Sequence, residues 1–158
     1  MNRIIKPKEA IKVSKEFKKQ GKKIVLVGGC FDIVHIGHIK FLENSKKKGD
    51  ILFVLLESNE KVKKLKGEGR PINSQIERAY VLQSIKYIDY VILLPNMKND
   101  DDYDKLISQL KPGVIATIKN DSMIEHKKRQ AKLVGAKIRY AMSRIKNKST
   151  TQLVKLIK

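Results

Sequence analysis

The sequence predicts an α/β fold in a single domain, with a doubly wound parallel sheet of about five strands and flanking helices. Short apolar runs typical of buried parallel strands occur at 23–27 and 51–56, and the segment between them has helical spacing of its apolar residues. Two parallel strands joined by one helix form a βαβ unit, whose crossover is right-handed in nearly all proteins. A length of 158 residues is sufficient for one such sheet and gives no indication of a second core.

The composition indicates a soluble cytoplasmic protein. Cys30 is the one cysteine of the sequence, which excludes an internal disulfide and suits a reducing compartment. No apolar run approaches the length of about 18 residues that a membrane span needs, and the lysine-rich N-terminus lacks the apolar region of a signal peptide. The formal net charge of +19 would attract nucleic acid, anionic lipid or a nucleoside triphosphate. The lysines are spread over the chain with few interleaved aromatic residues, which favours a general lysine-rich surface over a nucleic-acid groove.

Local patterns predict the remaining elements. A helix is expected from Pro7, a favoured first helical residue, to Gly21, a favoured residue just past a C-terminus. Residues 1–21 would form this lead-in helix, and residues 22–158 would form the α/β core. Further strands are predicted at 90–94, 114–118 and 137–140, and further helices after Ile36, from the capping box Ser74-x-x-Glu77, over 103–110, before Gly135 and after Ser149. The carboxylates within 100–104 are expected to cap the helix that they begin and not to bind a metal.

The stretch from Gly28 to His38 lies between the first predicted core strand and the helix that follows it. The first turn of a helix offers unpaired backbone N–H groups and partial positive charge, which suit a phosphate. His35 and His38 lie three residues apart with Gly37 between them, so their imidazole N–H groups can donate to phosphoryl oxygens on which negative charge grows. The order of strand, paired glycines, His-x-Gly-His and helix therefore predicts a phosphate-reactive turn, in which Cys30 is a small spacer and not a nucleophile.

Segments that follow other strands are expected to face the same site, because ligands of parallel sheets bind beyond the carboxyl ends of the strands. The lysine- and glycine-rich segment 57–73 is expected to be a mobile cationic loop that folds over a triphosphate. Residues 119–121 follow a later strand and offer polar side chains at the same edge. Arg78 lies in the first turn of a helix, where a cation opposes the helix dipole, so a compensating anionic group is expected nearby.

The run Gly-Cys-Phe-Asp-Ile-Val-His-Ile-Gly-His at 29–38 closely resembles the signature of the cytidylyltransferase-like nucleotidyltransferases, which have a Rossmann-like fold. A second segment, 144–151, resembles the family's Arg-Thr-x-Gly-Ile-Ser-Thr-Ser/Thr signature, with Asn147 in place of the glycine. The lead-in helix and the run Leu-Lys-Gly-Glu-Gly-Arg-Pro-Ile-Asn are most similar to the adenylyltransferase domain of ADP-heptose synthase, followed by glycerol-3-phosphate cytidylyltransferase. The resemblance implies transfer of a nucleotidyl group to a phosphorylated acceptor with release of pyrophosphate.

The resemblance also implies roles for residues of this chain. The residues implied to act in catalysis carry an imidazole or a cation: His35, His38, Lys64, Lys66 and Arg144. The residues implied to bind the nucleotide come from the two signatures and the basic segments between them: Gly29, Cys30, Phe31, Asp32, Gly37, Arg70, Arg78, Ser149, Thr150 and Thr151. The residues implied to lie near the acceptor are polar: Asp32, Asn59, Asn120 and Asp121. This last group departs from the family pattern, because relatives usually carry aspartate in place of Asn59 and glycine within 119–121.

Within the family, the resemblance favours ATP as the nucleotide and a sugar 1-phosphate, such as heptose 1-phosphate, as the acceptor. CTP with glycerol 3-phosphate and adenylyl transfer to FMN stay open as alternatives, and so does a basic nucleic-acid-binding protein on the same fold. Mg²⁺ is expected to travel with the triphosphate, since this ion usually binds through phosphates and few protein ligands, and no protein metal cluster is expected. The sequence does not reveal the oligomeric state, although small enzymes of this kind are often homodimers.

Overall fold

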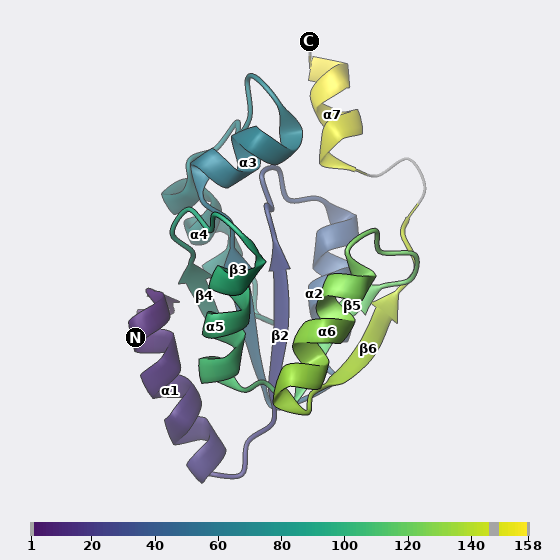
Figure 1. Cartoon of the computed structure of the whole chain (residues 1–158). Coiled ribbons are helices and arrows are strands. Elements are labelled where there is room, and N and C mark those ends of the chain that lie inside the picture. Colours follow the sequence, from purple (N-terminus) through teal and green to yellow (C-terminus); the bar gives the residue numbers. More distant parts are fainter. Residues whose placement is uncertain (1, 146–148, 158) are drawn as a thin grey trace.

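A six-stranded parallel sheet lies at the centre of the computed structural model, which describes residues 2–145 and 149–157 (Figure 1). The strand order is β1-β4-β3-β2-β5-β6. In the described ranges the strands are β1 (Ile4–Ile5), β2 (Ile24–Gly29), β3 (Ile51–Leu56), β4 (Tyr90–Leu93), β5 (Val114–Ile118) and β6 (Lys137–Met142). The helices are α1 (Pro7–Lys19), α2 (Ile36–Lys46), α3 (Asn59–Lys66), α4 (Gln75–Gln83), α5 (Asp100–Leu110), α6 (Ile124–Val134) and α7 (Thr150–Ile157). Asn147, the residue predicted to replace the glycine of the second signature, lies outside the described residues.

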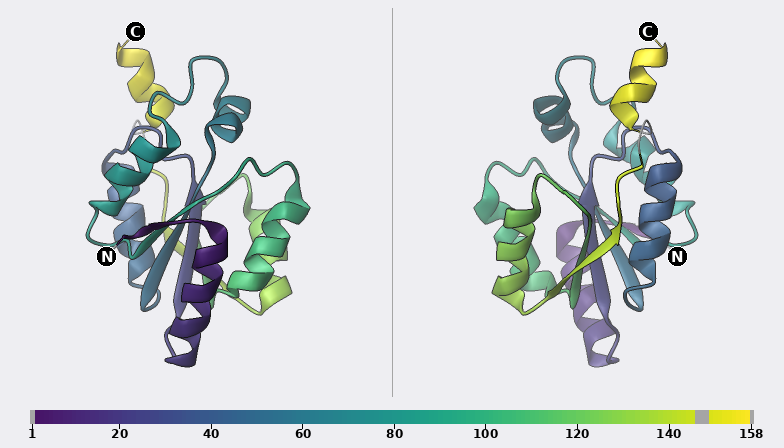
Figure 2. Two further views of the ribbon diagram at one scale, coloured as in Figure 1. Left: turned by 90° about the vertical axis from the view of Figure 1, so that its left-hand side faces the viewer. Right: turned by 90° about the vertical axis from the view of Figure 1, so that its right-hand side faces the viewer.

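Helices cover both faces of the sheet, which confirms the predicted doubly wound, Rossmann-like α/β class (Figure 2). Successive side chains of a strand point to opposite faces. Val25 and Val27 of β2 accordingly pack in one buried cluster with Leu42 of α2 and with residues of α4. Ile24 and Leu26 pack in a second buried cluster with residues of α1, α5 and α6. A strand that is buried on both faces explains the uninterrupted apolar run of the sequence.

The number of strands differs from the prediction, because the sheet has six strands and not about five. The additional strand is β1, which pairs in parallel with β4 through Ile4 and Val91 at the edge of the sheet. Two residues are too few to show an alternating pattern, so this strand has no signal in the sequence. The predicted boundaries of β3 and β5 are confirmed, as are the start of α1 at Pro7 and the capping box of Ser74 and Glu77.

Two local expectations are wrong. The paired glycines do not end the strand, because β2 continues through Gly28 and Gly29, paired with Leu55 and Leu56. The segment after β3 is not a loop throughout, since its first part is the helix α3. Ser58 caps this helix by accepting a hydrogen bond from the Lys61 backbone at 3.1 Å, and Val62 is fully buried beneath it.

The direction of chain progression reverses beside β2. From β2 the chain continues outward through β3 and β4, and it then returns to the other side of β2 to form β5 and β6. Such a switch point opens a crevice beyond the carboxyl ends of the strands. In the part of the chain that the structure describes, no helix is long and apolar enough to cross a bilayer.

Candidate active site

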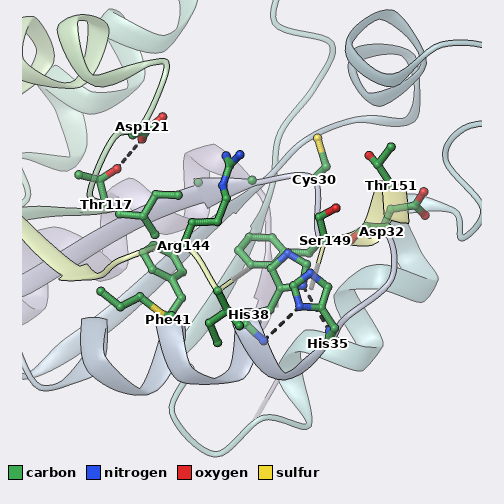
Figure 3. Close-up of a pocket in the computed structure, with 18 of the residues that line it drawn as sticks. Cys30, Asp32, His35, His38, Phe41, Thr117, Asp121, Arg144, Ser149 and Thr151 are labelled. Carbon is green, nitrogen blue, oxygen red and sulfur yellow. Dashed lines mark hydrogen bonds between the residues drawn. The ribbon is translucent and has the colours of Figure 1, made fainter. Parts of the chain in front are cut away.

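A cavity of about 610 Å³ opens at this switch point, beyond the carboxyl ends of β2, β5 and β6 (Figure 3). It contains the phosphate-reactive turn together with residues that lie more than a hundred positions later in the chain. Its lining residues are Gly28, Gly29, Cys30, Phe31, Asp32, His35, Gly37, His38, Phe41, Lys66, Arg70, Thr117, Ile118, Asp121, Lys127, Met142, Arg144, Ile145, Ser149, Thr150 and Thr151. Most of the predicted site residues are among them, and the exceptions are Lys64, Arg78, Asn59 and Asn120.

The two histidines of the turn form a stacked pair. Their ring centroids lie 3.9 Å apart at an interplanar angle of 29°, and both rings line the cavity. The backbone N–H of Gly37 donates to Nδ1 of His35 at 3.1 Å, and the backbone N–H of His35 donates to Nδ1 of His38 at 3.4 Å. A nitrogen that accepts a hydrogen bond carries no proton, so each ring carries its proton on Nε2. The helix start therefore fixes the tautomer in which both rings present an N–H donor.

Burial, followed by the charges of His35 and Lys66, lowers the pKa of His38 to about 4. His38 is therefore a neutral donor throughout the physiological pH range. We expect the His38 ring resonances to titrate near pH 4, and not near the ordinary value of about 6.5. Proton NMR of the folded protein between pH 3.5 and 8 measures this, and a midpoint above 6 would contradict it. Because the pKa is depressed in the folded state, this group lowers stability as the pH falls from about 6.5 toward 4.

Phe31 packs against the ring of His38. Its ring is buried and lies 5.1 Å from the His38 ring, centroid to centroid. A Cβ atom on Gly29 would lie 2.8 Å from the Phe31 ring, so glycine at this position admits the aromatic ring. Gly29 thus supports the site by packing. Burial raises the pKa of the neighbouring Cys30 thiol, which agrees with the predicted role of a spacer.

The Asp32 carboxylate lines the cavity and is held by hydrogen bonds from protein groups. Its carboxylate accepts hydrogen bonds from Arg70 Nε at 2.6 Å and from the backbone N–H groups of Ile72 and Asn73 at 2.9 and 3.0 Å. The side-chain amide of Asn73 donates a hydrogen bond to the Asp32 carbonyl at 2.9 Å. Burial alone would raise the pKa of Asp32, but these hydrogen bonds and the Arg70 charge outweigh it and hold the pKa below its ordinary value. The carboxylate therefore clamps the segment 70–73 onto the phosphate-reactive turn.

Arg78 is also a structural residue here, although the resemblance implied that it binds the nucleotide. Its side chain is 1% exposed and does not line the cavity. The guanidinium donates to the carbonyls of Cys30 at 2.6 Å and Asn73 at 3.0 Å, and to Oδ1 of Asn59 at 3.0 Å. The Asn59 side chain is thereby bound to Arg78. Burial lowers the pKa of Arg78, and the nearby carboxylates of Asp32 and Glu57 oppose this shift, so the expected anionic compensation is present.

The cationic and hydroxyl groups of the site come from three distant segments. Lys66, the last residue of α3, lines the cavity, whereas Lys64 is exposed outside it. Arg144 follows β6 and extends into the cavity across from the histidines (Figure 3). The start of α7 closes one side, where Thr150 Oγ1 donates to the carbonyl of Ile33 at 3.0 Å. Cations and a helix N-terminus at one cavity favour a polyphosphate ligand.

The opposite wall of the cavity is an ion-paired cluster, of which only Asp121 was predicted from the sequence. Asp121, a predicted site residue, accepts from Lys127 Nζ at 2.5 Å and from the hydroxyl of Thr117. Burial would raise the pKa of Asp121, but these bonds lower it, so the carboxylate is ionised. The preceding Asn120 lies outside the cavity with φ +60°, a left-handed conformation that suits the glycine of relatives. Thr117 was missed, although a polar residue within the apolar run 114–118 was a usable signal.

A stacked histidine pair facing cations at the switch point suits the triphosphate of a nucleotide, and it defines a nucleotide-binding protein of the doubly wound α/β class. Residues 26–155 match the model of the cytidylyltransferase-like family, and the chain belongs to this family. This membership confirms the nucleotidyltransferase class that the two signatures predicted.

Curated relatives agree with this assignment. The bifunctional protein HldE of Nitratiruptor sp. is 46% identical over 103 residues, which are 65% of this chain and 21% of the relative. HldE of Wolinella succinogenes is 41% identical over 113 residues, which are 72% of this chain and 23% of the relative. These HldE proteins belong to the ADP-heptose synthase group that the sequence resembled most. The chain spans about a fifth of the length of these relatives.

Solved structures show the same fold. The lipopolysaccharide core biosynthesis protein from Thermoplasma volcanium is 27% identical, with a TM-score of 0.61 over 79% of this chain and 98% of that chain. The pantoate-beta-alanine ligase from Francisella tularensis, complexed with beta-gamma ATP and beta-alanine, has a TM-score of 0.65 over 97% of this chain and 76% of that chain. Its sequence identity is 16%, so it supports the fold alone.

Proposed function

We propose that the chain transfers a nucleotidyl group from a nucleoside triphosphate, with ATP favoured over CTP, to the phosphate of a sugar 1-phosphate such as heptose 1-phosphate, and releases pyrophosphate. The observation that carries this proposal is the pair of Nε2–H donors on His35 and His38, held by backbone N–H groups and facing the cavity. The relatives named HldE and the lipopolysaccharide core biosynthesis protein support a sugar phosphate as the acceptor.

The transfer needs no nucleophile from the protein. An oxygen of the acceptor phosphate, which is anionic near neutral pH, attacks the α-phosphorus, and a new P–O bond forms. The bond from the α-phosphorus to the bridging oxygen breaks, and its electron pair leaves with pyrophosphate. Donors on His35 and His38 stabilise the negative charge on the oxygens of the α-phosphorus, and Lys66 and Arg144 neutralise the triphosphate. Positioning and charge neutralisation therefore supply most of the rate.

We also propose that Mg²⁺ enters with the triphosphate. Across 2–145 and 149–157, no group of three or more His, Cys, Asp or Glu side chains has an arrangement that would hold a metal. Asp32, the carboxylate in the reactive turn, is bound to Arg70 and to two backbone N–H groups. When bound, Mg²⁺ would reduce the negative charge of the phosphates. The residues present fit an ion carried mainly by phosphate oxygens.

A panel assay of pyrophosphate release tests the proposal. ATP or CTP is combined with heptose 1-phosphate, glycerol 3-phosphate, phosphocholine or FMN in the presence of Mg²⁺. We expect release with ATP and heptose 1-phosphate to exceed that of every other pair. Greater pyrophosphate release with CTP and glycerol 3-phosphate, or with ATP and FMN, would show that the substrates are those of the alternative and not ATP and heptose 1-phosphate. Absence of release with all pairs would overturn the nucleotidyl transfer itself.

A further inference from the structure

Glu57 is a partly buried carboxylate at the carboxyl end of β3 that the proposed transfer does not use. Its backbone N–H donates to the carbonyl of Gly29 at 3.2 Å, which holds it beside the end of β2. Tyr103 of α5 directs its hydroxyl at the carboxylate, with Oε1 and Oε2 at 2.9 and 3.0 Å. A hydroxyl has one proton to donate, whereas a carboxylate has about four acceptor positions. Glu57 therefore keeps acceptor capacity for further donors.

Lys61 completes a cluster with these two residues. Its Nζ lies 5.3 Å from the centroid of the Tyr103 ring and 3.4 Å from the carbonyl oxygen of Met97. Glu57, Lys61 and Tyr103 are each partly exposed, so a solute can reach them. Burial raises the pKa of Glu57, while the bond from Tyr103 and the charge of Lys61 oppose this shift. The cluster thus offers acceptor oxygens and an ammonium donor side by side.

The cluster lies beside the cavity, toward β3 and β4. Glu57 follows β3, Tyr103 belongs to the helix after β4, and neither lines the cavity. Two features of the backbone connect the cluster to the cavity: the Glu57 N–H donates to the carbonyl of the cavity residue Gly29, and α3 carries both Lys61 and the cavity residue Lys66. A second substrate that reaches an α-phosphorus held at the histidine pair would therefore approach across Glu57.

We propose that Glu57, Lys61 and Tyr103 form the subsite that binds the hydroxyl groups of the phosphorylated acceptor, so that the acceptor is a polyhydroxylated phosphate ester. This inference rests on the proposed function and names the residues that select its second substrate. The carboxylate accepts hydrogen bonds from hydroxyl groups, and Lys61 donates to hydroxyl oxygens. The Lys61 ammonium repels an acceptor with a cationic head group such as phosphocholine. Glu57 is a specificity-determining residue in this arrangement.

Direct binding of the acceptor tests the subsite without turnover. Isothermal titration calorimetry of the full chain with heptose 1-phosphate, in the presence of α,β-methylene ATP, whose bond between the α-phosphorus and the bridging group is not cleaved, is compared between wild type and Glu57→Gln. We expect the acceptor Kd to rise at least about tenfold in Glu57→Gln, since a charge-assisted hydrogen bond is lost from a nearly isosteric side chain. The Kd of the ATP analogue is expected to stay within about twofold, because the nucleotide lies on the other side of β2.

Glu68→Gln is the matched control. Glu68 follows α3, is exposed and pairs with Lys63 at 3.3 Å, so the same charge is removed outside the cluster. We expect wild-type acceptor binding in this variant, and weakened acceptor binding with intact nucleotide binding in Tyr103→Phe. Equal acceptor affinity in Glu57→Gln and wild type, tighter binding of phosphocholine than of heptose 1-phosphate, or no binding of any sugar phosphate by wild type would overturn the subsite. Acceptor binding that depends on Glu57 without pyrophosphate release would support the subsite and overturn the transfer reaction.

Discussion

Replacement of His38 by alanine is expected to lower kcat by at least about a hundredfold, because one preorganised donor to the reacting phosphoryl group is lost. The donor is Nε2–H, since Nδ1 of His38 accepts from the backbone of His35. The KM for ATP is expected to change less, because Lys66 and Arg144 still line the cavity. Steady-state pyrophosphate release with ATP and heptose 1-phosphate measures both constants.

His126→Ala is the control for this experiment. His126 lies on α6, is exposed and pairs with Asp100 at 3.0 Å, outside the residues that line the cavity. Its removal should leave kcat unchanged, and circular dichroism melting of both variants shows that each is folded. A kcat of His38→Ala within a few fold of wild type would rule out the catalytic role of this ring.

Replacement of Asp32 by alanine is expected to lower the free energy of unfolding by about 3–5 kcal/mol at pH 7, because it leaves the buried Arg70 guanidinium without its partner. The side chain of Asp32 is 1% exposed and that of Arg70 is 7% exposed, so the ion pair is largely shielded from solvent. Two backbone N–H groups, of Ile72 and Asn73, lose their acceptor in the same variant. Urea denaturation measures the change.

Glu16→Ala provides the contrast of an exposed ion pair. Glu16 pairs with Lys19 at 3.0 Å, and both side chains are largely exposed. Its removal should cost less than about 1 kcal/mol, since surface pairs contribute little. An equally small loss of unfolding free energy in Asp32→Ala would show that the contacts of Asp32 with the segment 70–73 do not stabilise the fold. The double variant Asp32→Ala, Arg70→Met should recover part of the loss, because it removes the unpaired charge as well.

The clamp also predicts how stability depends on pH. The pKa of Asp32 is lower in the folded state than in the unfolded chain, so its contribution is complete above the unfolded value of about 3.9. This contribution is lost as the pH falls through the folded value, where the carboxylate becomes protonated. Stability of wild type should therefore decline at acidic pH more steeply than that of Asp32→Ala.

Much of the fold could be predicted because its signals are local. The apolar runs 51–56 and 114–118 are strands with those boundaries, and Pro7 begins a helix as expected. The order of strand, glycines, His-x-Gly-His and helix predicted the reactive turn, which the structure places at the cavity. Each of these patterns requires only residues that are neighbours in the chain, so a periodicity or a cap is sufficient to predict it.

The roles of several polar side chains could not be predicted because they depend on partners far along the chain. Asp32 binds Arg70, 38 positions away, and Arg78 binds Cys30, 48 positions away. By residue type, Asp32 and Arg78 could equally have bound a ligand, and only packing shows that they bind protein groups. Glu57 and Tyr103 meet across 46 positions, and no spacing rule connects them. Lys64 and Lys66 look alike in sequence, but only Lys66 lines the cavity.

The sequence by itself determined the parallel α/β architecture, the turn that carries His-x-Gly-His and the family, because these follow from short-range patterns of apolar, glycine and histidine residues. The tertiary structure alone decided which polar groups face the cavity and which brace the backbone around it. The physical reason is that a buried polar group must find a hydrogen-bonding partner, and the fold determines whether that partner is another residue or is left to a ligand.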